Sequence, residues 1–161
     1  MTLCNFACKQ RNMRTVIQRV NRASVAYEDQ IHGIATGLVL LIGIEEGDNE
    51  EDIEWLVKKI IHLRIFNDAE GRMNLSSMDV HAEILVISQF TLHASTRKGN
   101  RPSFVKAAEP AIAIPLYHKF LEVLHHKFKG KIKTGKFGAS MIVEIHNDGP
   151  VTIFIDTKNK E

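Results

Sequence analysis

Apolar and polar residues follow two different periods along this chain. The apolar runs at residues 38–44 and 84–87 are nearly continuous, which predicts strands that are buried on both faces. Residues 50–63 carry Ile, Leu and Val three and four positions apart, which predicts an amphipathic helix. Residues 110–128 repeat that spacing and begin with Pro110, a residue that suits the first turn of a helix. The chain therefore combines buried strands with two helices.

Five shorter segments have strand-like patterns, interrupted by Gly, Asn and Asp at turns. They are residues 13–20, 23–27, 64–66, 140–145 and 151–155. Two helices cannot cover both faces of about seven strands, so sheet must pack on sheet. We therefore expect a mixed α/β fold with two packed β-sheets in a barrel-like arrangement. The two helices lie outside, giving β/β/α layers in a single domain.

Length and composition agree with one globular domain. The chain has 161 residues, of which 44% are apolar and 25% are charged. Residues 1–12 show no usable period and are interpreted as a poorly specified N-terminal extension, which leaves 13–161 as the domain. No apolar run reaches the ~18 residues of a membrane span. Cys4 and Cys8 are too few for a disulfide framework or a zinc site, so a reducing cytoplasmic location is expected.

Charge is distributed unevenly. Residues 28–83 carry 4 Lys or Arg and 13 Asp or Glu, whereas residues 91–140 carry 10 and 2. A basic half favours an anionic partner, although a solvated surface explains it equally well. Two basic clusters could follow a phosphate backbone. The first is the lysine ladder of Lys127, Lys129, Lys131, Lys133 and Lys136, and the second is Arg97, Lys98 and Arg101.

Several familiar catalytic motifs are absent. The chain contains no GxSxG elbow, no HExxH and no phosphate-binding loop. His118, Glu122 and His125 share one face of the second helix, but without a fourth ligand a solvated surface is favoured over a metal site. His93 could be a general base, yet no Asp adjoins it in sequence to orient it. We expect no metal and no cofactor.

Two further segments could take part in a reaction or bind a ligand. Ser88 and Thr91 lie at the end of a buried strand, where α/β sheets place their sites. Either hydroxyl could be a nucleophile, but bonding to the backbone is favoured because no activating base is visible. Gly149-Pro150 forms a tight turn that can hold a cis peptide bond. Its carbonyl oxygens could accept hydrogen bonds from an ammonium group, and a plain hairpin turn is the alternative.

Taken together, these segments resemble the D-aminoacyl-tRNA deacylase family. The matching stretches are MRTVIQRV at 13–20, FNDAEGRMN at 66–74, SQFTL at 88–92, KGNRPSF at 98–104, TGKFGASM at 134–141 and NDGPVT at 147–152. The resemblance implies a hydrolase of the ester between a D-amino acid and the 3′-terminal adenosine of tRNA. It also implies removal of glycine from mischarged tRNA-Ala, chiral proofreading in translation, and a homodimer with active sites at the subunit interface.

The resemblance also assigns roles to residues. Gly149 and Pro150 match a cis dipeptide that enters the partner's site and rejects L-amino acids, and Arg19 matches the arginine that braces it. The catalytic segment is Ser88, Gln89, Phe90 and Thr91. Its backbone N–H groups around Phe90 and Thr91 would bind the scissile carbonyl. The wall for the terminal adenosine is Phe137, Gly138 and Met141.

In the implied mechanism, water attacks with help from the 2′-hydroxyl of the tRNA, and Thr91 as a covalent nucleophile is the minor alternative.

Three other functions stay open. One is a same-fold editor of L-alanyl-tRNA, which Phe90 disfavours because it is the residue expected of the D-specific type. The others are a non-catalytic nucleic-acid-binding protein and a metal hydrolase built on the helix histidines.

Overall fold

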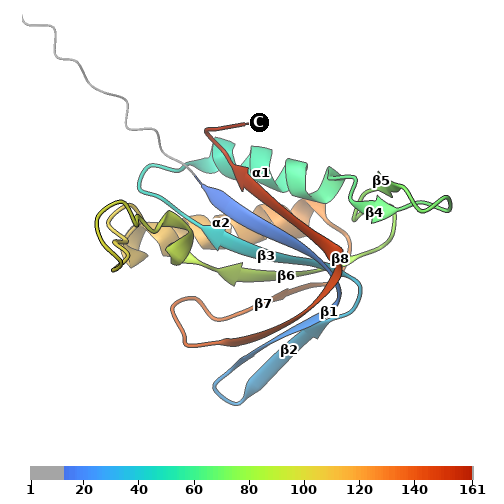
Figure 1. Cartoon of the computed structure of the whole chain (residues 1–161), viewed down its shortest axis with the longest axis horizontal. Coiled ribbons are helices and arrows are strands. Elements are labelled where there is room, and N and C mark those ends of the chain that lie inside the picture. Colours follow the sequence, from blue (N-terminus) through green and yellow to red (C-terminus); the bar gives the residue numbers. More distant parts are fainter. Residues whose placement is uncertain (1–12, 161) are drawn as a thin grey trace, which may run out of the picture.

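The computed structural model describes residues 13–160 of the chain, and Figure 1 shows its course. This part contains eight strands, two α-helices and one 3-10 helix. In chain order the elements are β1 (Arg14–Tyr27), β2 (Gln30–Ile34), β3 (Gly37–Gly43), α1 (Glu50–His62), β4 (Phe66–Asn67), β5 (Met73–Leu75), β6 (Glu83–Ser88), η1 (Phe90–His93), α2 (Pro110–Lys127), β7 (Ile132–Thr134) and β8 (Ile142–Asp156).

Six of the strands form one mixed sheet in the order β2-β1-β3-β6-β7, with β8 paired to β1. Strands β3, β6 and β7 are parallel to one another, whereas β1 is antiparallel to β2, β3 and β8. The first half of β1 pairs with β3 and its second half with β2, so the sheet curves as β1 changes neighbours (Figure 1). This confirms the predicted mixed, barrel-like α/β fold, in which the two packed layers are halves of one curved sheet.

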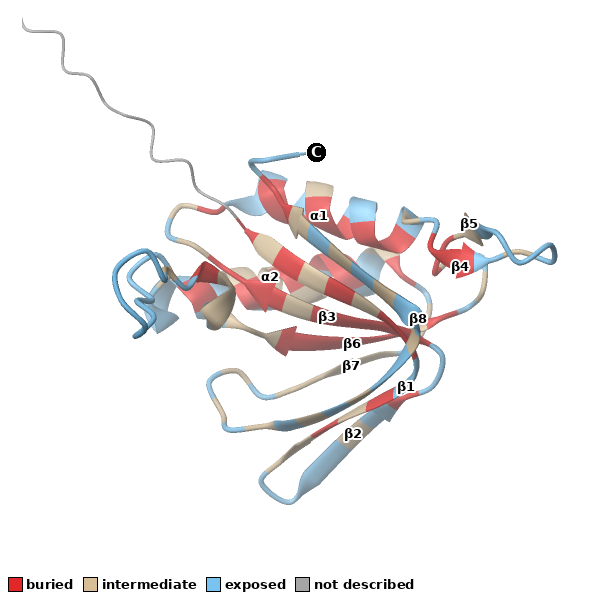
Figure 2. Ribbon diagram, in the orientation of Figure 1, coloured by how far each residue is buried: buried red, intermediate tan, exposed pale blue. Residues whose placement is uncertain are grey.

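Two apolar clusters pack on either side of the sheet. Figure 2 shows that the buried residues concentrate in β3, β6 and the neighbouring part of β1. Both helices pack on the face that carries Leu38, Leu40 and Val86, which explains why their apolar stripes are buried. The opposite face carries Val39 and Leu85, which lie inside the curve of the sheet. Alternate residues of β3 and β6 thus enter different clusters. That is why these strands read as continuous apolar runs.

A capping box fixes the beginning of α1. Asn49 caps the helix, because its side-chain oxygen accepts hydrogen bonds from the N–H groups of Glu51 at 2.9 Å and Asp52 at 3.2 Å. The Asp52 carboxylate in turn accepts from the Asn49 N–H at 3.2 Å, which completes a capping box. The prediction for α2 is also confirmed, since this helix begins at Pro110.

The long strands differ from the sequence-based expectation. Residues 13–20 and 23–27 were expected as two strands, but they form the single strand β1. Residues 140–145 and 151–155 were also expected as two strands, but β8 continues through the predicted turn at Gly149-Pro150. Between the pairs Asn147–Val20 and Thr152–Gln18, residues 148–151 of β8 stand opposite Arg19 alone. Such a bulge breaks the alternation of a strand in the sequence, so it is easily taken for the strand's end.

Two predictions concern residues outside the described part of the chain: the poorly specified extension over 1–12 and the metal-like spacing of Cys4 and Cys8. Within residues 13–160, neither α-helix has the length and apolar character needed to cross a bilayer.

Candidate active site

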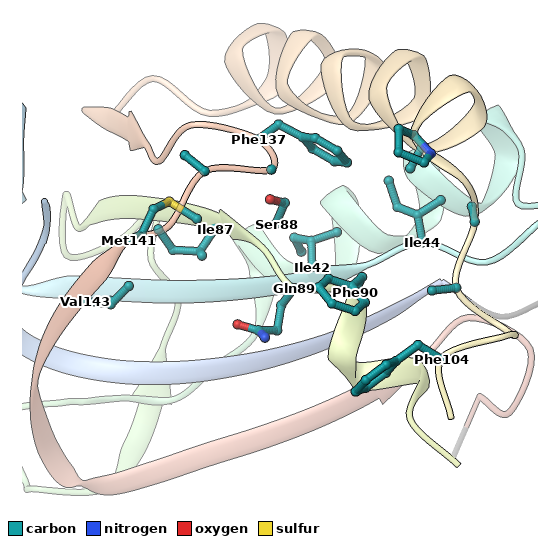
Figure 3. Close-up of a pocket in the computed structure, with 16 residues that line it drawn as sticks. Ile42, Ile44, Ile87, Ser88, Gln89, Phe90, Phe104, Phe137, Met141 and Val143 are labelled. Atoms are coloured by element: carbon teal, nitrogen blue, oxygen red, sulfur yellow. The ribbon is translucent and has the colours of Figure 1, made fainter. Parts of the chain in front are cut away.

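A pocket of about 600 Å³ opens at the carboxyl ends of the parallel strands β3 and β6 (Figure 3). This is the edge at which open α/β sheets usually bind ligands. Most of the lining is apolar, and the polar side chains in it are Ser88 and Gln89. The lining residues are Ile42, Ile44, Ile87, Ser88, Gln89, Phe90, Phe104, Ala107, Ala108, Pro110, Ala113, Phe137, Gly138, Ala139, Met141 and Val143.

Three residues of the predicted catalytic segment line this pocket. The pairing of β6 with β3 ends at Ser88, and the Gln89 N–H then donates to the Ile42 carbonyl at 2.7 Å. From Phe90 the chain turns into the 3-10 helix η1. Phe90 and Thr91 are therefore the first two residues of a helical turn, and the first N–H groups of such a turn have no partner inside it.

Thr91 does not line the pocket. Its hydroxyl oxygen accepts a hydrogen bond from the Gln89 side-chain amide. An amide donor does not remove a proton from a hydroxyl, so this contact gives Thr91 no activation as a nucleophile.

His93 lies at the end of η1 and is fully buried. Its Nδ1 is 4.0 Å from a carboxylate oxygen of Glu45. Burial lowers the pKa of His93, so the imidazole is neutral at pH 7. His93 is absent from the pocket lining, and its position does not support the role of general base that the sequence left open.

The predicted adenosine wall faces the catalytic segment across the pocket. Phe137, Gly138 and Met141 all belong to the lining, and Figure 3 shows Phe137 beneath α2 with Phe90 on the other side. The Phe137 ring packs against Tyr117 of α2, with a centroid distance of 5.5 Å. Phe90 packs edge-on against Phe104 at 5.1 Å. The pocket thus has aromatic side chains on two sides, which are surfaces on which a flat aromatic ring can stack.

The loop that carries Phe137 is also attached to the β1–β2 hairpin. His32 Nδ1 lies 3.0 Å from the carbonyl oxygen of Thr134, and Lys136 forms an ion pair with Glu28. These contacts fix both the end of β7 and the residue that precedes Phe137. The position of the aromatic wall therefore depends on a hairpin more than a hundred residues away in sequence.

The Gly149-Pro150 peptide bond is cis, and both residues are exposed. Neither lines the pocket of its own chain. Arg19 holds the bulge that contains them: its Nε lies 3.3 Å from the Asp148 carbonyl oxygen and 3.0 Å from the Asp148 carboxylate. Its Nη1 donates to the carbonyl of Ile65 at 2.5 Å. The structure thus brings Arg19 to the dipeptide but does not bring the dipeptide to the pocket.

Arg14 is a residue that the sequence reasoning missed. Its guanidinium donates to Asp156 at 3.0 Å through Nε and to the Leu92 carbonyl of η1 at 3.1 Å through Nη1. It therefore links η1 to the ends of β1 and β8. A charge at the start of an apolar strand was the available signal, but no local pattern pairs residues 142 positions apart.

The remaining candidates are not assembled into sites. Glu122 pairs with Lys119, and no group of metal-binding side chains is found in residues 13–160. The lysine ladder is largely neutralised by ion pairs. These join Lys127 to Glu54, Lys131 to Glu83 and Lys136 to Glu28.

Comparison with known proteins identifies what this arrangement is similar to. The family model described as D-Tyr-tRNA(Tyr) deacylase matches residues 16–156. A D-aminoacyl-tRNA deacylase of Bacteroides thetaiotaomicron is 59% identical over 150 residues, which cover 92% of this chain and all of the relative. A solved structure titled c-Myc DNA Unwinding Element Binding Protein is 43% identical, with a TM-score of 0.83 over 88% of this chain and 97% of its own. A probable eukaryotic D-amino acid tRNA deacylase shares the fold, with 17% identity and a TM-score of 0.77 over 90% and 99%.

Proposed function

The chain belongs to the D-Tyr-tRNA(Tyr) deacylase family, and from that premise we propose a specific course for its reaction. As a D-aminoacyl-tRNA deacylase, it is a hydrolase of the ester that joins a D-amino acid to tRNA. The proposal places the ester at the start of η1, the terminal adenosine against Phe137, and the reaction in the cytoplasm. The observation that carries it is the single pocket lined by both the Ser88–Phe90 segment and the Phe137 loop.

In the proposed mechanism, the N–H groups of Phe90 and Thr91 bind the carbonyl oxygen of the ester. Negative charge develops on that oxygen when water attacks, and aimed N–H donors stabilise it. The 2′-hydroxyl of the terminal ribose assists the water. The bond from the carbonyl carbon to the 3′-oxygen then breaks, and that oxygen takes up the proton that the attacking water has lost. The products are free tRNA and a free amino acid, and no side chain forms a covalent intermediate.

Chirality is read by the Gly149-Pro150 dipeptide of a second subunit in this proposal. Its carbonyl oxygens accept hydrogen bonds from the substrate ammonium group and leave no room for an L side chain. Glycine has no side chain to reject, so glycyl-tRNA is also a substrate. The exposure of the dipeptide and its absence from the pocket of its own chain support a homodimer.

Strand β8 offers a surface for that homodimer. Among the described residues it pairs with β1 alone, so one edge of a strand of 15 residues lacks a neighbour. A long unpaired edge is ordinarily covered in soluble proteins. Two large apolar side chains of the same strand are also exposed, Ile142 at 72% and Phe154 at 56%. A second copy would cover both the edge and these side chains.

Matched D- and L-tyrosyl-tRNA test the proposed function directly. Catalytic amounts of protein are expected to hydrolyse the D ester at least about a hundredfold faster than the L ester, because rejection rests on a steric clash. Ester loss is followed by the release of labelled amino acid. Glycyl-tRNA is expected to be hydrolysed as well. Equal rates for the two enantiomers, or no turnover of either, would contradict the proposal.

Replacing Thr91 with alanine tests the absence of a covalent intermediate. Because the hydroxyl accepts from Gln89 and lies outside the pocket lining, T91A is expected to keep kcat within about tenfold of the wild type. Single-turnover kinetics measure the chemical step. A loss of several orders of magnitude would instead support Thr91 as the nucleophile.

One comparison favours a second candidate function, which is nucleic-acid binding without catalysis. The relative of 43% identity is titled a DNA unwinding element binding protein. Turnover separates the two functions: a binding protein releases at most one amino acid per binding site, whereas an enzyme at a low ratio to tRNA releases many.

A further inference from the structure

The segment between η1 and α2 forms a closed basic loop, defined here as residues 95–106. Two backbone hydrogen bonds between Ser95 and Ser103, at 2.8 and 2.9 Å, close residues 96–102 of this segment into a loop. The basic loop carries four cations and no Asp or Glu. These cations are Arg97, Lys98, Arg101 and Lys106, and all four are exposed. In Figure 2 the loop stands out from the body of the protein as a pale blue, exposed segment.

The four cations of the basic loop differ from the lysine ladder at residues 127–136. Within residues 13–160, none of the four makes an ion pair or a side-chain hydrogen bond. The lysine ladder, by contrast, pairs with acidic side chains at three of its five members. Of the two basic clusters in the sequence, the loop is therefore the one whose charge is available to an anion from outside.

The basic loop also borders the pocket. Phe104, near its end, lines the pocket and packs on Phe90, and the next residues, Ala107 and Ala108, continue the lining. Figure 3 shows Phe104 at the margin of the pocket, on the side of Phe90 and away from Phe137. A backbone hydrogen bond from the Ala108 N–H to the Ile44 carbonyl, at 2.9 Å, fixes the chain there. The loop that carries the free cations thus adjoins the margin of the pocket at Phe104.

We propose, resting on the proposed function, that the basic loop binds the phosphates of the nucleotides that precede the terminal adenosine of tRNA. A polynucleotide whose last nucleotide is held in the pocket must pass over its margin. Phosphate groups there would meet Arg97, Lys98 and Arg101 without displacing any ion pair of the protein. Such contacts hold the backbone irrespective of sequence and weaken as salt is added.

The position of these contacts determines which kinetic constant they govern. The phosphates lie away from the bond that breaks, so they are bound equally in the ground state and the transition state. Uniform binding of this kind lowers KM and leaves kcat unchanged. It also vanishes for a substrate that lacks phosphates. The adenosine ester of D-tyrosine is such a substrate, since it keeps the nucleoside and the amino acid alone.

The test compares two triple variants that remove the same number of charges. The loop variant is Arg97→Gln, Lys98→Gln and Arg101→Gln. The control variant is Lys119→Gln, Lys127→Gln and Lys131→Gln, all of which are paired with Glu in the structure. For D-tyrosyl-tRNA, the loop variant is expected to raise KM at least about tenfold with kcat unchanged, while the control stays within about threefold. The slope of log(1/KM) against log[salt] is expected to be smaller in magnitude by about 2 in the loop variant. Each single-strand phosphate contact contributes ~0.7 to this slope, and the variant removes three cations.

Two further measurements make the result decisive. On the D-tyrosine ester of adenosine, both variants are expected to match the wild type. An equal loss on this ester would show a structural role for the loop, and equal KM values of both variants on tRNA would overturn the proposal. Binding of uncharged tRNA by fluorescence anisotropy needs no turnover. If the wild type hydrolysed no ester, the deacylase mechanism would fail, yet weaker binding by the loop variant than by the control would still support the phosphate contact.

Discussion

Replacement of Gly149 with alanine is expected to lower kcat/KM for D-tyrosyl-tRNA about a hundredfold while that for L-tyrosyl-tRNA does not fall. The reason lies in the space around the residue. Gly149 has a φ of +116°, a conformation that L side chains rarely adopt. A methyl group there would lie 3.0 Å from Arg19 Nη2 and 3.1 Å from Val151 Cγ2. Either the bulge or the guanidinium must move.

Arg19 has little freedom to yield. It is 5% exposed, and its guanidinium contacts Asp148 on one side and the Ile65 carbonyl on the other. The bulge must therefore move instead. Its carbonyl oxygens, which are proposed to accept hydrogen bonds from the ammonium group, move with it. A shift of about 1 Å in a positioning group is enough to cost a hundredfold in rate. A bulge that has moved also excludes the L side chain less completely.

A matched glycine provides the control for this variant. Gly71 has a φ of +77°, and apart from its two chain neighbours no residue comes within 4 Å of the place that an added methyl group would take. Gly71→Ala therefore places an L side chain in an unfavourable positive-φ conformation, as Gly149→Ala does, but without the close contacts. It is expected to retain both rates and to lower the melting temperature no more than Gly149→Ala does. A Gly149→Ala enzyme with the wild-type D rate would show that the dipeptide does not read the substrate.

How far the sequence leads toward this fold can be judged from particular elements. The helices were predictable because burial of one face imposes a 3.6-residue period, as at Ile53, Leu56 and Ile60. The continuous apolar runs identified β3 and β6 as buried strands. The bulge at residues 148–151 was not predictable, since its partner Arg19 lies some 130 positions earlier and no local pattern records strand pairing.

The candidate site was predictable in a different way. Ser88 and Phe137 were reached through residue types at a strand end and through the family resemblance, and the pocket does join their two segments. The apolar lining was missed, because Ile42 and Ile87 follow the same pattern as the core residues beside them. These two residues belong to the core clusters and line the pocket as well, because the parallel pairing of β3 with β6 ends at Ile42–Ser88. Tertiary pairing, which the sequence does not display, makes that difference.

The proposed sharing of each site by two subunits leads to the last prediction, on heterodimers that carry the same two substitutions in different arrangements. Ala139 lines the pocket, so Ala139→Trp is expected to obstruct it, while Gly149→Ala disables the dipeptide. Each homodimer alone is expected to have little activity on D-tyrosyl-tRNA. Differently tagged chains, co-expressed and purified through both tags, give defined heterodimers for the assay.

In the first heterodimer, one subunit carries Ala139→Trp and the other Gly149→Ala. If each site combines the pocket of one subunit with the dipeptide of its partner, one of its two sites is intact and about half of the wild-type activity returns. In the second heterodimer, a wild-type subunit faces one that carries both substitutions. Here the intact pocket meets the altered dipeptide and the intact dipeptide meets the obstructed pocket, so activity stays near zero. Sites complete within one subunit would reverse the two results, which makes the pair a direct measurement of where each active site is assembled.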